Sequence, residues 1–250
     1  MIQELQEKLE LCSKNEHLYL EYLKNPEYNA EYLIMNLISC NLQIAANEIF
    51  GKKDIYKGKN CFFRAALLKL FLHENYDKGT YTSSNLFLVS NGFMYSILSD
   101  NPKLINRLSI YEDNFLDTFG ACFAKAIQAC MRGDNKYLIE QITNLERHTR
   151  KGNAKNYSGI SIAFKGLMEF DKNTIEEGIK EILSKHNKQE QPTVIKDYLN
   201  LEALTLAKLA LRKGILVNID NPLLPKEMIP INALENYKGY DILKEIEAFL

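Results

Sequence analysis

Three consecutive segments of this chain share one pattern of apolar residues when they are aligned, without gaps, on an aspartate. The segments lie around residues 90–109, 121–148 and 160–186, and the aligned residues are Asp100, Asp134 and Asp171. Apolar side chains stand 11, 7 and 3 residues before each aspartate and 4, 8 and 11 residues after it. Each half of the pattern has the spacing of an amphipathic helix, so every segment predicts two helices joined at the aspartate.

The spacing of the three copies indicates how these helix pairs pack. The copies are 34 and 37 residues apart, a period typical of stacked helical hairpins, which bury their apolar stripes against one another. The aspartate is expected to cap the second helix, although Asn101 before Pro102 is an equally suitable start in the first copy. A small residue eight positions before the aspartate would let the paired helices approach closely: Gly92, Ala126 and Ala163, respectively.

The rest of the chain also has helical periodicity, with few residues that interrupt it. Only 12 glycines and 6 prolines occur, and they fall mostly between the periodic segments. Further helices are predicted over residues 3–12, 16–23, 28–50, 60–76, 192–213 and 241–250. The sequence therefore predicts an all-α fold of stacked antiparallel helical hairpins, an α-solenoid or tetratricopeptide-like bundle, although the tetratricopeptide consensus itself is not met.

We expect one helical domain over residues 1–250, in three parts. An N-terminal group of helices, residues 1–80, could form a subdomain of its own. The helical hairpins follow over residues 86–188. A long helix and a short, extended, proline-containing segment complete the chain over residues 192–250.

Composition and charge argue against several classes of function. A net charge of -1 gives no basic field for nucleic acid or anionic lipid. The longest uncharged run, residues 79–99, is too polar to span a bilayer, and the N-terminus is charged from its fourth residue, unlike a signal peptide. The five cysteines form no CxxC pair, which indicates free thiols in a reducing compartment. We therefore expect a cytoplasmic protein without a nucleic-acid or membrane partner.

Two histidines are candidates for chemistry. His73 and Asp77 stand one helical turn apart and could share a metal ion, but the zinc-protease pattern needs a second histidine in place of Asp77, so a solvated helix end is the preferred interpretation. His148 could act as a general base. A helix C-terminus whose cations face the dipole, followed by Gly152, explains its surroundings better. The charged neighbours of His148 are Glu146, Arg147, Arg150 and Lys151.

Two other clusters could contact a partner. The predicted polar loop 51–60 carries Tyr56 among lysines, like a small nucleic-acid contact, although a solvated loop is the simpler interpretation. Residues 17–33 hold four tyrosines, which are frequent in interfaces, but we favour core packing with the hydroxyls at the surface. The lysines are Lys52, Lys53, Lys57 and Lys59, and the tyrosines are Tyr19, Tyr22, Tyr28 and Tyr32.

The glycine- and lysine-containing segment 151–161 lacks the spacing of a phosphate loop, so we expect a linker between helices. Neither a nucleophile elbow nor a glycine-rich dinucleotide motif occurs. We therefore assign no catalytic, cofactor-binding or metal-binding residue, and the partner-binding residues are unknown.

The C-terminal part carries a different pattern. A helix, "ALTLAKLALRKG", ends at a basic pair and Gly214, and the segments "ILVNID" and "NPLLPKEMIP" follow it. Gly214 is expected to adopt the left-handed conformation that stops a helix. The prolines then hold the tail in an extended path over the helical body, where it covers apolar surface.

In an all-helical chain of this length, residues 203–230 resemble the C-terminal block of the immunity protein 49 family of bacterial polymorphic toxin systems. The resemblance implies a non-enzymatic protein that binds a cognate toxin domain and blocks it, without a cofactor. It implies no specific binding residues. Two alternatives stay open from the residues alone. One is a helical-repeat adaptor or regulator that binds a peptide or protein. The other is a helical enzyme whose residues are scattered over distant helices, which a cleft with a strongly shifted histidine or carboxylate around His73 or His148 would indicate.

Overall fold

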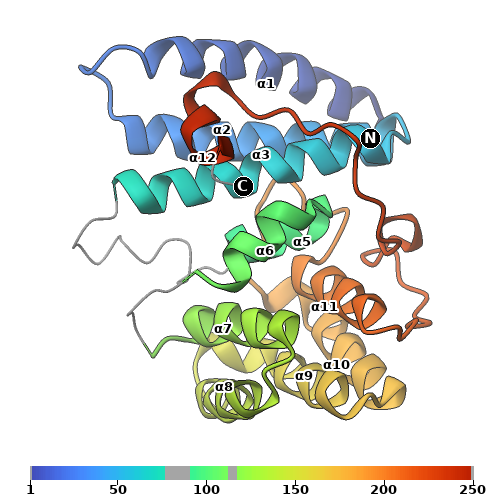
Figure 1. Ribbon diagram of the computed structural model, residues 1–250. Helices are drawn as coiled ribbons and strands as arrows, with labels where there is room; N and C mark the ends of the chain where they lie inside the picture. The colour runs from blue at the N-terminus through green and yellow to red at the C-terminus, as the bar shows by residue number, and fades with distance from the viewer. Residues whose placement is uncertain (1, 77–90, 112–116, 249–250) are drawn as a thin grey trace.

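The computed structural model describes residues 2–76, 91–111 and 117–248, and within these ranges every regular element is a helix (Figure 1). This confirms the predicted all-α class. At the N-terminal end, α2 (Ala30–Ala46) packs between α1 (Ile2–Tyr22) and α3 (Ile55–Asn75). A π-helical turn, Asn47–Gly51, continues α2. Gly58 is required in α3, because a Cβ atom there would lie 2.3 Å from the side chain of Ile49.

Each of the three aligned segments forms two helices, as predicted. The pairs are α5 (Asn91–Ser99) with α6 (Pro102–Ser109), α7 (Phe119–Arg132) with α8 (Asn135–His148), and α9 (Gly159–Glu169) with α10 (Lys172–Ser184). The described residues at the aligned apolar positions are all buried or partly buried, and Val89 lies outside the described residues. That the pairs stack as a solenoid stays a prediction.

The small residue and the cap of the pattern have the expected roles in the third copy. Ala163 lies against Gly178 of α10 so closely that a Cβ atom on Gly178 would come within 2.4 Å of the Ala163 nitrogen. Asp171 caps α10 by accepting a hydrogen bond from the backbone N–H of Asn173 at 2.9 Å. In the second copy, Asp134 caps α8 in the same way through Tyr137, at 3.0 Å.

Asp100, in the first copy, has a different role, because Asn101 caps α6 through the N–H of Leu104 at 2.9 Å. The Asp100 side chain is fully buried and pairs with Lys59 of α3 at 2.6 Å. It also pairs with Lys208 at 2.9 Å and Arg212 at 3.1 Å, both from α11 (Leu201–Arg212). We call these four side chains the Asp100 cluster.

The C-terminal tail completes the Asp100 cluster. The backbone N–H of Asn232 donates to Asp100 at 3.2 Å. Lys208 donates to the carbonyl of Met228 at 3.0 Å, and Lys59 donates to the carbonyl of Asn232 at 3.1 Å. Burial lowers the pKa of the Lys208 ammonium to about 8, although Asp100 acts in the opposite direction. The cluster therefore joins α3, the α5–α6 turn, α11 and the tail at one buried point.

The prediction of one long helix over residues 192–213 is wrong for its first half. Residues 193–198 form turns, and α11 begins only at Leu201. Asn200 explains the difference, since its side chain caps α11 through Ala203 at 2.9 Å while its backbone N–H donates to the carbonyl of Leu223 in the tail at 2.8 Å. A residue engaged in this way cannot continue a helix. The predicted burial of α11 on more than one side is confirmed, because residues 201–210 are all buried.

Other predicted boundaries also differ. The helices predicted over residues 3–12 and 16–23 are one continuous helix, α1. The predicted loop 51–60 ends at Asp54, which caps α3 through the N–H of Lys57 at 3.0 Å. The predicted final helix is a 3-10 turn, Asp241–Leu243, followed by the short α12 (Lys244–Ala248). Further 3-10 turns are Asn153–Tyr157, His186–Lys188 and Lys226–Met228.

The start of the tail agrees with the sequence, but the proline-containing segment, predicted as extended, forms a turn at residues 222–223 and the 3-10 turn Lys226–Met228. Gly214 has a φ of 80°, the left-handed conformation expected at the end of α11. The following segment is extended, with Val217 and Ile219 buried and the residues between and beside them exposed. The tail then passes the Asp100 cluster and reaches the N-terminal helices, where Tyr240 contacts Asn41 and Glu16 (Figure 1).

Replacement of Asp100 by asparagine tests the cluster. Asp100→Asn leaves the buried cations without their anion, so we expect a loss of about 3–5 kcal/mol in the free energy of unfolding. The matched control is Asp134→Asn at the aligned position, where asparagine caps a helix as well as aspartate and we expect a change below about 0.5 kcal/mol. Denaturant-induced unfolding measures both. Equal stability of the two variants would contradict the role given to Asp100.

Candidate functional site

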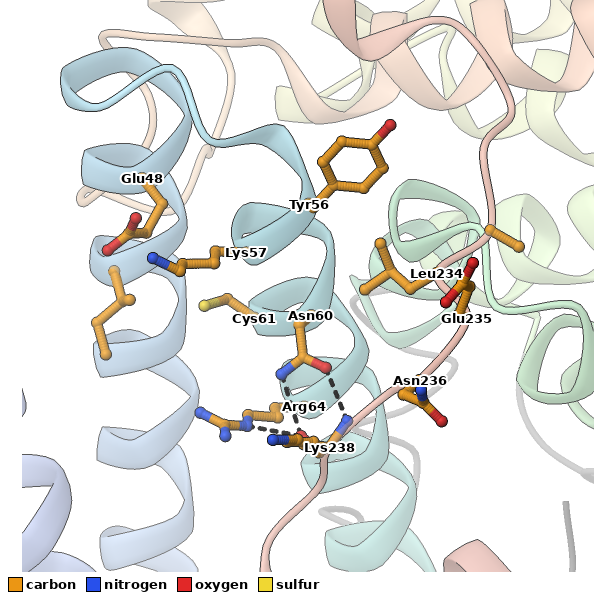
Figure 2. Close-up of a pocket in the computed structure, with 12 residues that line it drawn as sticks. Glu48, Tyr56, Lys57, Asn60, Cys61, Arg64, Leu234, Glu235, Asn236 and Lys238 are labelled. Atoms are coloured by element: carbon orange, nitrogen blue, oxygen red, sulfur yellow. Dashed lines mark hydrogen bonds between the residues drawn. The ribbon is translucent and has the colours of Figure 1, made fainter.

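A pocket of about 880 Å³ lies between the first turns of α3 and the C-terminal tail (Figure 2). Residues 44–64 form one wall and residues 233–238 form the other. Asn60 holds the walls together, because it donates to the carbonyl of Lys238 at 3.1 Å and accepts from its N–H at 2.8 Å. Arg64 donates to the same carbonyl at 2.8 Å. Two side chains of α3 therefore position the tail as a wall.

The lining of this pocket mixes aromatic, cationic and acidic groups. Tyr56 is 63% exposed, and Figure 2 shows its ring extending into the space between α3 and the tail, where Leu234 also lies. Lys57, Arg64 and Glu235 add charge to the lining. Aromatic residues and arginine are enriched in protein interfaces, where a polar rim surrounds them.

Glu48 lies at the opposite side of the pocket and is only 6% exposed. One carboxylate oxygen accepts from Lys52 at 2.8 Å. The other oxygen, Oε2, has no hydrogen-bond partner among the described residues. Cys61 also lines the pocket, but burial raises the pKa of its thiol to about 12, so the thiol stays protonated and is a poor nucleophile at neutral pH.

His148 contacts a carboxylate that the sequence did not connect with it. Its Nε2 atom lies 2.9 Å from Oδ1 of Asp117, and Arg147 binds the same carboxylate at 2.6 Å. Arg147, followed by His148, holds the pKa of Asp117 at about 2. The cations do occupy the last turn of α8, as expected, but that helix ends at His148 and not at Gly152. Cys122 stands beside this group, and its Sγ, the Asp117 carboxylate and the His148 ring could together hold a metal ion.

The other predicted candidates have structural partners. His73 packs edge-on against Tyr111 with 5.4 Å between ring centroids, and Asp77 lies outside the described residues. Lys59 is buried in the Asp100 cluster and is not in an exposed loop. Lys52 pairs with Glu48, and Lys57 lies 3.4 Å from Asp54. Residues 149–158 connect α8 to α9, which confirms the predicted linker, although its last three predicted residues, 159–161, already belong to α9.

The preference for core tyrosines is wrong for three of the four residues. Tyr22, Tyr28 and Tyr32 are exposed, and only Tyr19 packs partly against the core. Tyr22 and Tyr28 stack on each other with 4.6 Å between ring centroids at the turn that joins α1 to α2. A local pattern does not tell which helix face or turn another element covers, so the sequence could not separate exposed from core tyrosines in this segment. We call Tyr22, Tyr28 and Tyr32 the aromatic patch.

The family model of immunity protein 49 matches residues 88–228, more than half of the chain. The chain belongs to the immunity protein 49 family. The match contains the predicted block 203–230 almost entirely and extends back through the three helix pairs. No curated protein and no solved structure matches the chain.

Some of the features described above lie inside the part of the chain that matches the immunity protein 49 model, and others lie outside it. Asp100, Lys208 and Arg212 lie within it, as do Asp117 and His148. Both walls of the pocket, residues 44–64 and 233–238, lie outside it. No sequence signal could connect these walls, because they are far apart in the chain and meet only in the fold. For Asp100 a signal did exist, since Asn101 already supplied a cap and left the aspartate without a local role.

Among the described residues, Ala30–Gly51 is long and apolar enough to cross a membrane by length and composition. Most of its apolar window is buried inside the protein, where α2 packs against α1 and α3. A core helix passes the same test of length and composition, so the segment is weak support for a membrane span.

Glu202 of α11 is a buried carboxyl group that the sequence analysis did not single out. Burial raises its pKa from 4.5 to about 7, and a hydrogen bond donated by Gln191 only partly opposes this. Between these two pH values the folded protein holds a proton that the unfolded chain releases. The free energy of unfolding therefore decreases as the pH rises from 4.5 to 7.

Glu202→Gln removes this titration and keeps the shape of the neutral side chain. We expect the variant to be more stable than the parent at pH 8, by up to about 3 kcal/mol, and equal to it near pH 4.5. The control is Glu177→Gln on the exposed face of α10, which should leave the free energy of unfolding unchanged at both pH values. Unfolding curves at the two pH values measure the difference. If Glu202→Gln stabilised the protein equally at both pH values, the raised pKa assigned to Glu202 would be contradicted.

Proposed function

We propose that this chain is an immunity protein that binds a cognate bacterial toxin domain and neutralises it by contact, without catalysis. The family match over residues 88–228 carries the proposal. We place the protein in the cytoplasm, the compartment in which its five cysteines, all of them free, stay reduced. The helix pairs, stacked side by side, would supply a rigid scaffold for one large partner.

We further propose the pocket between α3 and the tail as the place where the toxin anchors. An inhibitor needs a few well-positioned anchor groups surrounded by polar contacts, and tyrosine is a frequent anchor. Tyr56 stands exposed in a recess whose lining carries charges of both signs, among them Lys57, Arg64 and Glu235. The position outside the family match suits a partner-specific surface built on a shared scaffold.

The function is tested by partner capture and by toxicity. The tagged full chain is expressed in the bacterium that encodes it, and the proteins that survive a high-salt wash are identified. We expect one stoichiometric partner that poisons cells when it is expressed alone and is tolerated when this chain is co-expressed. A mixture of housekeeping proteins, or a partner that is harmless alone, would overturn the proposal and favour an adaptor.

The site is tested with two exposed tyrosines of equal accessibility. Tyr56→Ala removes the proposed anchor, so we expect at least about 30-fold weaker toxin binding, the equivalent of about 2 kcal/mol. Tyr32→Ala is the matched control, because Tyr32 is 64% exposed in the aromatic patch on α2. Titration calorimetry with the captured partner gives both affinities. If only Tyr32→Ala weakened toxin binding, the binding site would be the aromatic patch and not the pocket, and the proposed immunity function would still hold.

A further inference from the structure

We propose that Asp117, Cys122 and His148 form a zinc-binding site that joins the start of α7 to the end of α8. Each residue offers one ligand atom, and these three atoms lie within 4.8 Å of one another. The site is independent of the proposed toxin binding, because it lies in the helix pair α7–α8 and needs no partner.

The distances fit a zinc ion. His148 Nε2 and Asp117 Oδ1 are 2.9 Å apart, and Cys122 Sγ is 3.8 Å from Asp117 Oδ1. Tetrahedral zinc with bonds of about 2.0–2.3 Å keeps its ligand atoms about 3–4 Å apart. Two of the three ligand pairs therefore already have about the separation that one shared ion requires, and the third pair, His148 Nε2 and Cys122 Sγ, lies within 4.8 Å.

Helix geometry places the three ligands. Thr118 caps α7 by accepting from the N–H of Ala121 at 3.2 Å, so Asp117 stands just before the helix and Cys122 faces inward from its first full turn. The chain turns at Gly133, whose φ of 69° ends α7, and α8 returns along α7. His148, at the last residue of α8, is thereby brought back beside the start of α7.

The kinds of ligand select the metal. A thiolate and an imidazole favour zinc over magnesium or calcium, which take oxygen ligands. Thiolate and carboxylate together balance the charge of a divalent ion when the Cys122 proton is released to solvent on binding. The side chain of Asp117 is 56% exposed, so a water molecule can take the fourth position.

Arg147 supplies the outer contact that such a carboxylate needs. Its Nη2 atom lies 2.6 Å from both oxygens of Asp117, and it also donates to Asn144 at 3.2 Å. Metal-bound carboxylates are usually held by a second hydrogen bond of this type. With Oδ1 on the metal, Arg147 keeps Oδ2 and fixes the orientation of the carboxylate.

Cobalt substitution tests the site on the full chain. The protein is stripped with a chelator and titrated with Co²⁺, which reports sulfur ligation through a thiolate-to-cobalt charge-transfer band. We expect one equivalent of Co²⁺, a band that Zn²⁺ displaces, and more than about tenfold weaker binding in Cys122→Ser and in His148→Gln. The control is Cys130→Ser, a buried cysteine about 12 Å further along α7, which should keep the band and the affinity.

Thermal unfolding gives a second measurement that does not depend on spectroscopy. Zn²⁺ at 100 times the Kd of the parent should raise the Tm of the parent and of Cys130→Ser by about 5 °C or more, and should raise the Tm of Cys122→Ser by clearly less, because that variant binds more than about tenfold more weakly. If a variant fails to fold, the cobalt band and the Zn²⁺-induced rise in Tm of the parent protein test the proposal. Cobalt binding without the sulfur band, a band that survives in Cys122→Ser, or no stoichiometric binding overturns the proposal.

Discussion

The buried carboxylate of Asp100 is the interaction on which the rest of this structure depends. Three cations converge on it from α3 and α11, at 2.6, 2.9 and 3.1 Å. Buried charges are tolerated only when partners and hydrogen bonds replace water, and one carboxylate cannot satisfy three cations. Backbone carbonyls of the tail supply the remaining acceptors, one at the end of the 3-10 turn Lys226–Met228 and one at Asn232 in the irregular chain that follows it.

The same arrangement creates the pocket. Lys59 and Asn60 are neighbours on α3, and they hold the tail at two places: Lys59 through the carbonyl of Asn232, and Asn60 through Lys238. The segment between these anchors, residues 233–236, spans the gap and becomes a wall of the pocket. A change at the Asp100 cluster would therefore reach the pocket through the tail. The cluster lies largely inside the family match, whereas the pocket lies outside it, so scaffold and recognition surface occupy different parts of the chain.

The two candidate sites differ in how they arise. The pocket needs residues 178 positions apart, Asn60 and Lys238, which the tail brings together. The Asp117, Cys122 and His148 group needs only one hairpin, since the return of α8 along α7 closes the distance. Sequence spacing alone did not reveal either one. The interval of 26 residues from Cys122 to His148 is no recognised ligand spacing, and its meaning depends on where α7 ends.

The sequence by itself determined the helical class, the three helix pairs with their buried stripes, the caps at Asp134 and Asp171, and the stop at Gly214. These features follow from interactions within a few residues, so periodicity and capping chemistry suffice to predict them. Only the tertiary structure decided that Asp100 is a buried counter-ion, that Asn200 shortens the predicted long helix, and that three tyrosines of the first hairpin are exposed. Each of these depends on partners more than a hundred residues away, on the position of the tail, or on which surfaces the other elements cover, and a local pattern contains none of this.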